Sequence, residues 1–282
     1  MSTIKLKKHT QQRHVAIELV TIVFSVVLYG IPFVFIILNS FKTRREAGLM
    51  KLSLPNPLQF KNYSEIFAFN DFIVAKSFYN SIVITALSIL ILTIVCSLAG
   101  FILQRRKGKP TNIVNTLFLA GLMLPPTILP TIWVMDFIGI YRSLFGMVLV
   151  EVALNIPFTV MLYRAYVGTV PLEIEEAAFI DGCPRKSLFW KIVFPLLKPV
   201  SSTVIVLNAV TIFNDFVNPL YFLPGARNST VQLTLNMFMG RFGSSWNLLF
   251  ADVVLITLPP LALFIFFNKK IVDGMTAGAI KG

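Results

Sequence analysis

Polar side chains interrupt several long apolar stretches of this 282-residue sequence. Two sets suit a hydroxyl-rich ligand, because amide and carboxylate groups together donate and accept hydrogen bonds in fixed geometry. Glu151 and Asn155 are four residues apart and so share a helix face. Asn214, Asp215 and Asn218 form the second set, and its two asparagines are again four apart. These five residues are the candidate ligand contacts, and the alternative is that they link neighbouring helices.

Catalytic and metal-binding patterns are missing from the sequence. It contains no GxxxxGK[ST] phosphate loop, no HExxH and no GxSxG. The histidines, His9 and His14, lie in the basic N-terminus, and the cysteines, Cys96 and Cys183, lack metal-ligand spacing. We therefore predict no catalytic residue, no metal site and no ATP bound by a phosphate loop.

The most polar stretch is EIEEAAFIDGCPRKSLFWKIVFPLLKP, from Glu173 to Pro199. Its glutamates suit the first turn of a helix, with Pro171 also in that turn and Thr169 as a candidate cap. Gly182 can end the helix in a left-handed conformation, and Pro184 prevents its resumption. We predict a helix of roughly three turns, whose two alanines allow another surface to approach. An ordinary interfacial loop is the alternative.

The composition predicts a membrane protein. Hydrophobic residues make up 56% of the chain and charged residues 13%, whereas about a quarter of a soluble domain is charged. The net charge of +12 would suit a nucleic-acid partner. The basic residues, however, form short clusters between apolar runs, where the positive-inside rule and anionic lipid headgroups account for them. We therefore predict contact with membrane lipid and no nucleic-acid partner.

Six apolar runs are long enough to cross a bilayer as helices, which takes about 20 residues each. They are 19–38, 82–103, 113–135, 144–163, 200–223 and 246–268. Prolines are predicted to break three of these runs, as a transport path would accommodate. They are Pro125, Pro126 and Pro130 in the third run, Pro157 in the fourth, and Pro259 and Pro260 in the sixth.

An even number of spans places both termini on one side of the membrane. That side holds 16 of the 25 lysines and arginines, so the positive-inside rule predicts cytoplasmic termini. The predicted organisation is a cytoplasmic segment 1–18, a six-helix domain 19–268 and a cytoplasmic tail 269–282. Within the domain, 39–81 and 224–245 are predicted extracytoplasmic loops, and 167–199 is the predicted cytoplasmic segment.

The cytoplasmic segment resembles the EAA signature of permease subunits in binding-protein-dependent ABC importers. That signature is Glu-Ala-Ala, three residues, Gly, nine residues, Ile, one residue and Leu-Pro. The matching residues in this chain are Glu176, Ala177, Ala178, Gly182, Ile192 and Pro195. The sequence departs only at Phe194, where one apolar residue replaces another.

Other stretches resemble the carbohydrate-uptake branch of this family. They are Asp181-Gly182, FPLLKP at 194–199 and NDFVNPL at 214–220. NSFKT at 39–43 and GMTAGAIKG at 274–282 resemble the six-span membrane component of the maltose type. The resemblance therefore covers nearly the whole chain.

The resemblance implies an all-α membrane protein with six transmembrane helices and the permease fold of type I ABC importers. In that family the EAA helix docks in a cleft of a cytoplasmic ATPase. The implied docking residues are Glu176, Ala177, Ala178, Asp181, Gly182, Ile192 and Pro195. The C-terminal tail is similar to one that reaches toward the interface between two ATPase subunits. This implies contacts there from Thr276, Gly278, Lys281 and Gly282.

The resemblance also implies a role for the whole chain. It would be a carbohydrate permease subunit in the bacterial plasma membrane, without enzyme activity. Its implied partners are two cytoplasmic ATPase subunits, a second and different permease subunit and an extracytoplasmic solute-binding protein. ATP and Mg bind to the ATPase, so no cofactor is implied for this chain. Three alternatives stay open: an ion-coupled transporter acting alone, an ABC permease for another solute, and a non-transporting scaffold.

Overall fold

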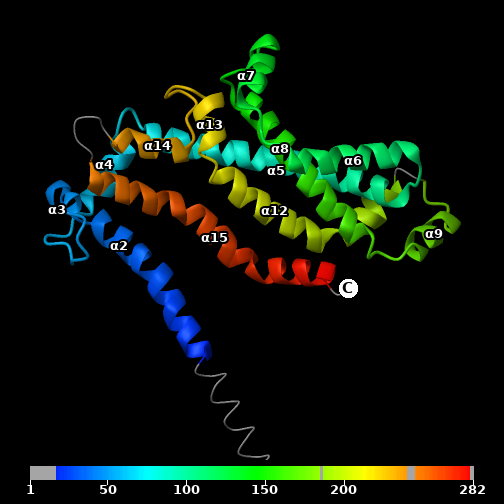
Figure 1. Cartoon of the computed structure of the whole chain (residues 1–282), viewed down its shortest axis with the longest axis horizontal. Coiled ribbons are helices and arrows are strands. Elements are labelled where there is room, and N and C mark those ends of the chain that lie inside the picture. Colours follow the sequence, from blue (N-terminus) through cyan, green and yellow to red (C-terminus); the bar gives the residue numbers. More distant parts are fainter. Residues whose placement is uncertain (1–16, 185–186, 240–244, 280–282) are drawn as a thin grey trace, which may run out of the picture. The chain divides into compact units, whose positions relative to one another are not determined.

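The computed structural model describes residues 17–184, 187–239 and 245–279, with side chains up to residue 267. All regular secondary structure within these ranges is helical. The described chain forms two compact units. Figure 1 labels most of the helices along the chain. Unit 1 contains residues 17–71 and 235–255, and unit 2 contains residues 72–234 and 256–279.

Unit 1 begins with an apolar helix, Ile17–Ser40, which includes a π-helical turn, η1 (Val26–Gly30), and ends as α2 (Ile31–Ser40). Two short helices follow, α3 (Arg44–Gly48) and α4 (Lys61–Ala68). The predicted loop 39–81 therefore contains two helices and the first residues of a third. The unit also includes the first part of α15 (Trp246–Ala279).

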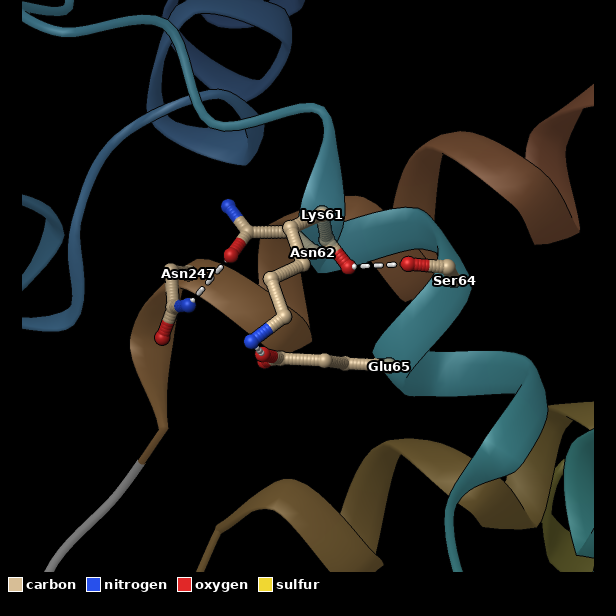
Figure 2. A network of polar contacts seen from close by, with 5 residues as sticks. All are labelled: Lys61, Asn62, Ser64, Glu65 and Asn247. Atoms are coloured by element: carbon tan, nitrogen blue, oxygen red, sulfur yellow. Dashed lines mark hydrogen bonds and ion pairs between the residues drawn. The ribbon is translucent and has the colours of Figure 1, made fainter.

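A buried asparagine ties the parts of unit 1 together. The Asn62 side chain donates to the carbonyl oxygens of Ser40 at 2.7 Å and Lys42 at 3.0 Å. Its Oδ1 accepts a hydrogen bond from Asn247 Nδ2 at the start of α15, at 2.8 Å (Figure 2). A single side chain thus satisfies backbone groups that would otherwise be buried without partners.

Unit 2 is built around three packed helices, α5 (Ile73–Arg105), α8 (Leu144–Val167) and α12 (Lys198–Phe213). Small residues on α5 let α8 approach closely. A Cβ atom at Gly100 would lie 2.7 Å from Tyr163 Cβ and 2.8 Å from the Arg164 backbone nitrogen. Tyr163 also donates to Ser201 Oγ at 2.9 Å, which links α8 to α12.

Four helices are long and apolar enough to span a membrane on their own. They are Ile17–Ser40, Ile73–Arg105, Leu144–Val167 and the Trp246–Phe267 part of α15. Two bent helix pairs are candidates for further spans. The helices α6 (Lys109–Met123) and α7 (Ile128–Phe137) meet at 118°. The pair η2 (Leu188–Val193) and α11 (Phe194–Leu196) meets α12 at 72°. The described residues thus hold four spans, or six if each bent pair counts as one.

The predicted proline breaks are only partly observed. The third run is broken between α6 and α7, where Pro125 and Pro126 lie. Pro130 falls in the first turn of α7, where its missing N–H costs no helical bond. Pro157 and Pro259-Pro260 lie inside the continuous helices α8 and α15. The prediction of breaks at these positions was wrong, because membrane helices tolerate proline when neighbours satisfy the freed carbonyls.

The fifth predicted span, 200–223, was also wrong as a single helix. α12 ends at Phe213, and α13 (Val217–Phe222) is separate. Asp215 Oδ1 accepts hydrogen bonds from the backbone N–H groups of Val217 at 2.9 Å and Asn218 at 3.2 Å. Such a local side-chain bond competes with continuation of the helix. The predicted loop 224–245 contains another helix, α14 (Val231–Phe238).

Candidate functional site

The EAA segment forms a short helix, α9 (Glu173–Ile180), which follows α8 in unit 2 (Figure 1). Its end is a Schellman motif. The Gly182 N–H donates to Phe179 O at 3.1 Å, and the Cys183 N–H donates to Ala178 O at 2.9 Å. Gly182 has φ +79°, a region in which a side chain is strained. The predicted left-handed stop at Gly182 is therefore confirmed.

The start of α9 differs from the prediction. Thr169 does not cap the helix, because its Oγ1 donates to Tyr166 O at 2.8 Å. Leu172 occupies the cap position without a side-chain bond, and Pro171 precedes the helix. α9 has 8 residues, about two turns rather than three. The backbone N–H groups of Thr169 and Val170 instead donate to Tyr166 O and Val167 O, in the turn that follows α8.

α9 presents two different faces. Glu175 and Ala178, three residues apart, are buried against the rest of unit 2. Glu176 and Ala177 are exposed, as are Asp181 and Gly182 beyond the helix end. Ile180 is 86% exposed, which is high for a large apolar side chain. The outer face therefore offers an acidic and an apolar surface to a partner.

An ion pair holds the inner face of α9 to the end of α5. Arg105 Nε donates to Glu175 Oε1 at 2.7 Å, and Arg105 Nη2 donates to Val170 O at 2.8 Å. The Arg105 and Glu175 side chains are 19% and 6% exposed. Such a charge-assisted pair holds its two side chains in a defined relative orientation. Neither residue was among the predicted site residues. The i, i+3 spacing of Glu175 and Ala178 could have identified Glu175 as an inner-face residue.

The other predicted docking residues divide between surface and core. Ala178 faces inward, and Ile192 is half-buried against the apolar core. Pro195 is exposed in α11. Thr276 and Gly278 belong to the last part of α15, beyond the described side chains, and Lys281 and Gly282 lie outside the described residues. Of the described docking residues, Glu176, Ala177, Asp181, Gly182 and Pro195 are therefore exposed, whereas Ala178 and Ile192 face the apolar core.

Four of the five candidate ligand contacts, Glu151, Asn155, Asp215 and Asn218, come together in unit 2. Asn155 Nδ2 donates to Glu151 O at 2.8 Å and approaches Glu151 Oε2 at 3.5 Å, which confirms their shared face. Asn218 Nδ2 donates to Asp215 Oδ2 at 2.6 Å. The Glu151 and Asp215 carboxyl groups are close enough to interact. A cluster thus forms between α8 and the α12–α13 turn.

Glu151 has unused hydrogen-bonding capacity. Its side chain is 2% exposed, and within the described residues no donor reaches its Oε1. A buried acceptor without a donor costs free energy, so the atom is suited to a ligand hydroxyl. The described residues contain no group of three or more His, Cys, Asp or Glu side chains suited to a metal ion.

Asn214 does not join this cluster. Its Oδ1 accepts a hydrogen bond from Gln232 Nε2 at 3.1 Å. The predicted shared helix face of Asn214 and Asn218 was wrong, because the chain breaks between α12 and α13. Asn208, also in α12, donates to Thr159 Oγ1 at 3.3 Å and so links α12 to α8.

Comparison with known proteins places these features in a family. Residues 96–277 match the family described as "Binding-protein-dependent transport system inner membrane component". The melibiose/raffinose/stachyose import permease protein MelC of Bacillus subtilis is 30% identical over 272 residues, which is 95% of this chain and 98% of MelC. The multiple sugar-binding transport system permease protein MsmG of Streptococcus mutans is 30% identical over 261 residues, 90% of this chain and 93% of MsmG.

A solved structure shares the fold. It is a bacterial ABC transporter involved in the import of the acidic polysaccharide alginate. One of its chains superimposes with a TM-score of 0.77 at 19% identity, covering 90% of this chain and 95% of that chain. The likeness confirms the all-α permease fold that the sequence predicted.

The chain belongs to the family of inner-membrane components of binding-protein-dependent transport systems. The family match includes the EAA segment and the polar cluster of unit 2. The predicted family is therefore confirmed. The chain is an inner-membrane protein that crosses the bilayer several times, and its relatives are transport permeases.

Proposed function

We propose that this chain is one of two permease subunits of an ABC importer for a carbohydrate, powered by ATP hydrolysis in two partner ATPases. The observation that carries the proposal is α9, an exposed helix with a glycine stop in a chain of this family. Relatives along most of its length carry names of sugar import systems, including melibiose, raffinose and stachyose for MelC. An oligosaccharide is therefore the expected substrate class.

α9 is the proposed docking element for an ATPase subunit. Its exposed residues Glu176, Ala177 and Ile180 would enter the partner's cleft. The Arg105–Glu175 ion pair would pass displacement of α9 to α5. Because α5 packs along α8 and α12, movement of α9 would shift the helices that carry the polar cluster. The C-terminal tail, with Thr276, Gly278, Lys281 and Gly282, is a second proposed contact with the ATPases.

The Glu151–Asp215 cluster is the proposed part of the sugar path in this chain. It combines carboxylate acceptors with the amide donors of Asn155 and Asn218. Sugar hydroxyls both donate and accept, so this mixture suits them. Glu151 Oε1 supplies an acceptor that is not used by the described residues.

The remaining partners complete the proposed importer. An extracytoplasmic binding protein would deliver sugar to the permease pair, and a different subunit would form the other half of the path. Both termini of this chain would be cytoplasmic, on the same side as α9. ATP and Mg would bind only to the partner ATPases.

The test is the ATPase activity of the affinity-purified complex in nanodiscs. Candidate sugar-binding proteins are added, each with and without its sugar. We expect one loaded binding protein to stimulate hydrolysis several-fold over its unloaded form. A chain that purifies without an ATPase, and that none of the binding proteins activates, would overturn the proposal in favour of an ion-coupled transporter.

A further inference from the structure

A second site lies in unit 2 where α5, α9 and η2 meet. These elements enclose an open groove with a volume of about 640 Å³. Its walls are largely apolar, formed by Leu98, Phe101 and Ile102 of α5 and by Phe189 and Trp190 of η2. Arg106, just past the end of α5, also lines the groove, as do Arg105 and Glu175. The groove thus has a largely apolar lining, with basic residues where α5 ends.

The charge at that end is not neutralised by the surrounding residues. Arg105 is engaged by Glu175 at 2.7 Å, so this pair adds little net charge. Arg106 is exposed and forms no ion pair with any described residue. The groove therefore offers one available guanidinium, a group that binds phosphate in bidentate geometry.

The apolar wall runs back from the arginine into the membrane-spanning part of α5. Leu98 precedes Arg106 by eight residues, or about 12 Å along a helix axis. Leu98 and Ile102 are both partly exposed large apolar side chains. Trp190 is also exposed and packs on Phe189 and Phe194, with ring centroids 5.0 and 5.4 Å apart. Tryptophan in this setting is typical of the headgroup level of a bilayer.

We propose that this groove binds one anionic phospholipid, with its phosphate on Arg106 and an acyl chain along Leu98, Ile102 and Trp190. A free phosphate would satisfy the arginine but leave the apolar wall uncovered. A soluble protein segment would not reach the part of α5 that lies within the bilayer. An anionic lipid supplies both a phosphate for Arg106 and an apolar chain for the groove wall, and it would contact α5, α9 and η2 together.

The test is native mass spectrometry on the purified full chain in detergent. Phosphatidylglycerol and phosphatidylcholine with identical acyl chains are titrated separately. Since one basic residue near a lipid surface contributes about 1 kcal/mol, we expect phosphatidylglycerol to bind roughly fivefold tighter. R106Q should remove that preference. K107Q, which changes an adjacent exposed charge outside the groove, should keep it.

A second variant tests the apolar wall. I102W places a bulky ring in the groove and should weaken binding of both lipids, with helical content unchanged by circular dichroism. Equal binding of the two lipids would overturn the proposal, as would equal effects of R106Q and K107Q. Unchanged binding to I102W would show that the lipid lies elsewhere. Displacement of phosphatidylglycerol by millimolar inorganic phosphate would identify a phosphate site instead. None of these readouts requires a working importer.

Discussion

The ion pair between Arg105 and Glu175 differs in surroundings from the one between Lys61 and Glu65. Glu175 is 6% exposed in its side chain, whereas Lys61 and Glu65 are 77% and 44% exposed and 3.3 Å apart (Figure 2). Removing one partner of a buried pair costs about 3–5 kcal/mol, and an exposed pair contributes about 0–1 kcal/mol. We expect R105A to lower the thermal unfolding midpoint by several degrees and K61A to leave it nearly unchanged.

Circular dichroism melts of the two variants in one detergent measure this difference. R105K should fall between them, because lysine keeps the charge but not the two-point geometry toward Glu175 and Val170. Equal midpoints for R105A and K61A would show that the pair does not hold α9 to α5.

The carboxyl of Glu151 is expected to contact the ligand rather than to stabilise the fold. E151Q keeps the shape of the side chain and supplies an N–H donor toward Asp215, so thermal stability should be maintained. Loss of a ligand contact should lower sugar-stimulated ATP turnover about tenfold, equivalent to ~1.4 kcal/mol. N208A is the matched control, since Asn208 links α12 to α8 and should reduce stability without reducing turnover per folded complex. A stable E151Q complex with full turnover would contradict this assignment.

At the scale of the element, the shape of the exposed end of α9 depends on the residue that ends the helix. Gly182 and Gly139 have similar left-handed backbones, with φ +79° and +73°, and neither has an atom within 4 Å of an added Cβ. A left-handed residue other than glycine costs roughly 1–2 kcal/mol. G182V and G139V should therefore destabilise the chain to a similar degree. Only G182V should uncouple ATP hydrolysis from sugar import, because only it reshapes the exposed end of α9.

Sugar uptake and ATPase activity, both normalised to folded complex, separate these outcomes. G182N is expected to retain more coupling than G182V, because asparagine adopts the left-handed region more readily. Similar coupling in G182V and G139V would remove α9 from the docking role.

The contact between α5 and α8 depends on a residue without a side chain. An added Cβ at Gly100 would lie 2.7 Å from Tyr163 Cβ, so the helices would have to separate. Gly30 in unit 1 has only ordinary contact for a Cβ, at 3.6 Å. G100A should lower the unfolding midpoint, whereas G30A should keep or raise it, because alanine favours helix by about 1 kcal/mol. Matching shifts for the two variants in thermal melts would contradict the close packing.

The elements that sequence analysis predicted well depend on local chemistry. Gly182 and the glutamates of α9 act within a few residues, and the break at Pro125-Pro126 follows from missing N–H groups. The features that the sequence did not predict depend on residues that are far apart along the chain. Arg105 and Glu175 are 70 positions apart, and no local pattern pairs them. The Glu151–Asp215 cluster likewise needs the turn after α12, and hydropathy alone extended that helix to residue 223.

At the scale of the whole molecule, the distribution of charge makes a prediction about orientation. The side with α9 and both termini would carry 16 of the 25 basic residues, which the positive-inside rule assigns to the cytoplasm. Three exposed positions report on the two sides: Lys107 between α5 and α6, Lys61 in α4, and Arg227 between α13 and α14. K61C and R227C should react with a membrane-impermeant maleimide in intact cells.

K107C should react only after the membrane is permeabilised, and all three variants carry C96A and C183S so that no native thiol contributes. The unsubstituted C96A/C183S chain is the control for background labelling. The reverse pattern would place α9 outside the cell, where no ATP-driven partner could dock, and the proposed coupling would then fail together with the orientation. Labelling of K61C and R227C on opposite sides would instead show an odd number of spans between them. In that case one of the bent pairs, α6–α7 or η2–α11 with α12, would not cross the bilayer as a single span.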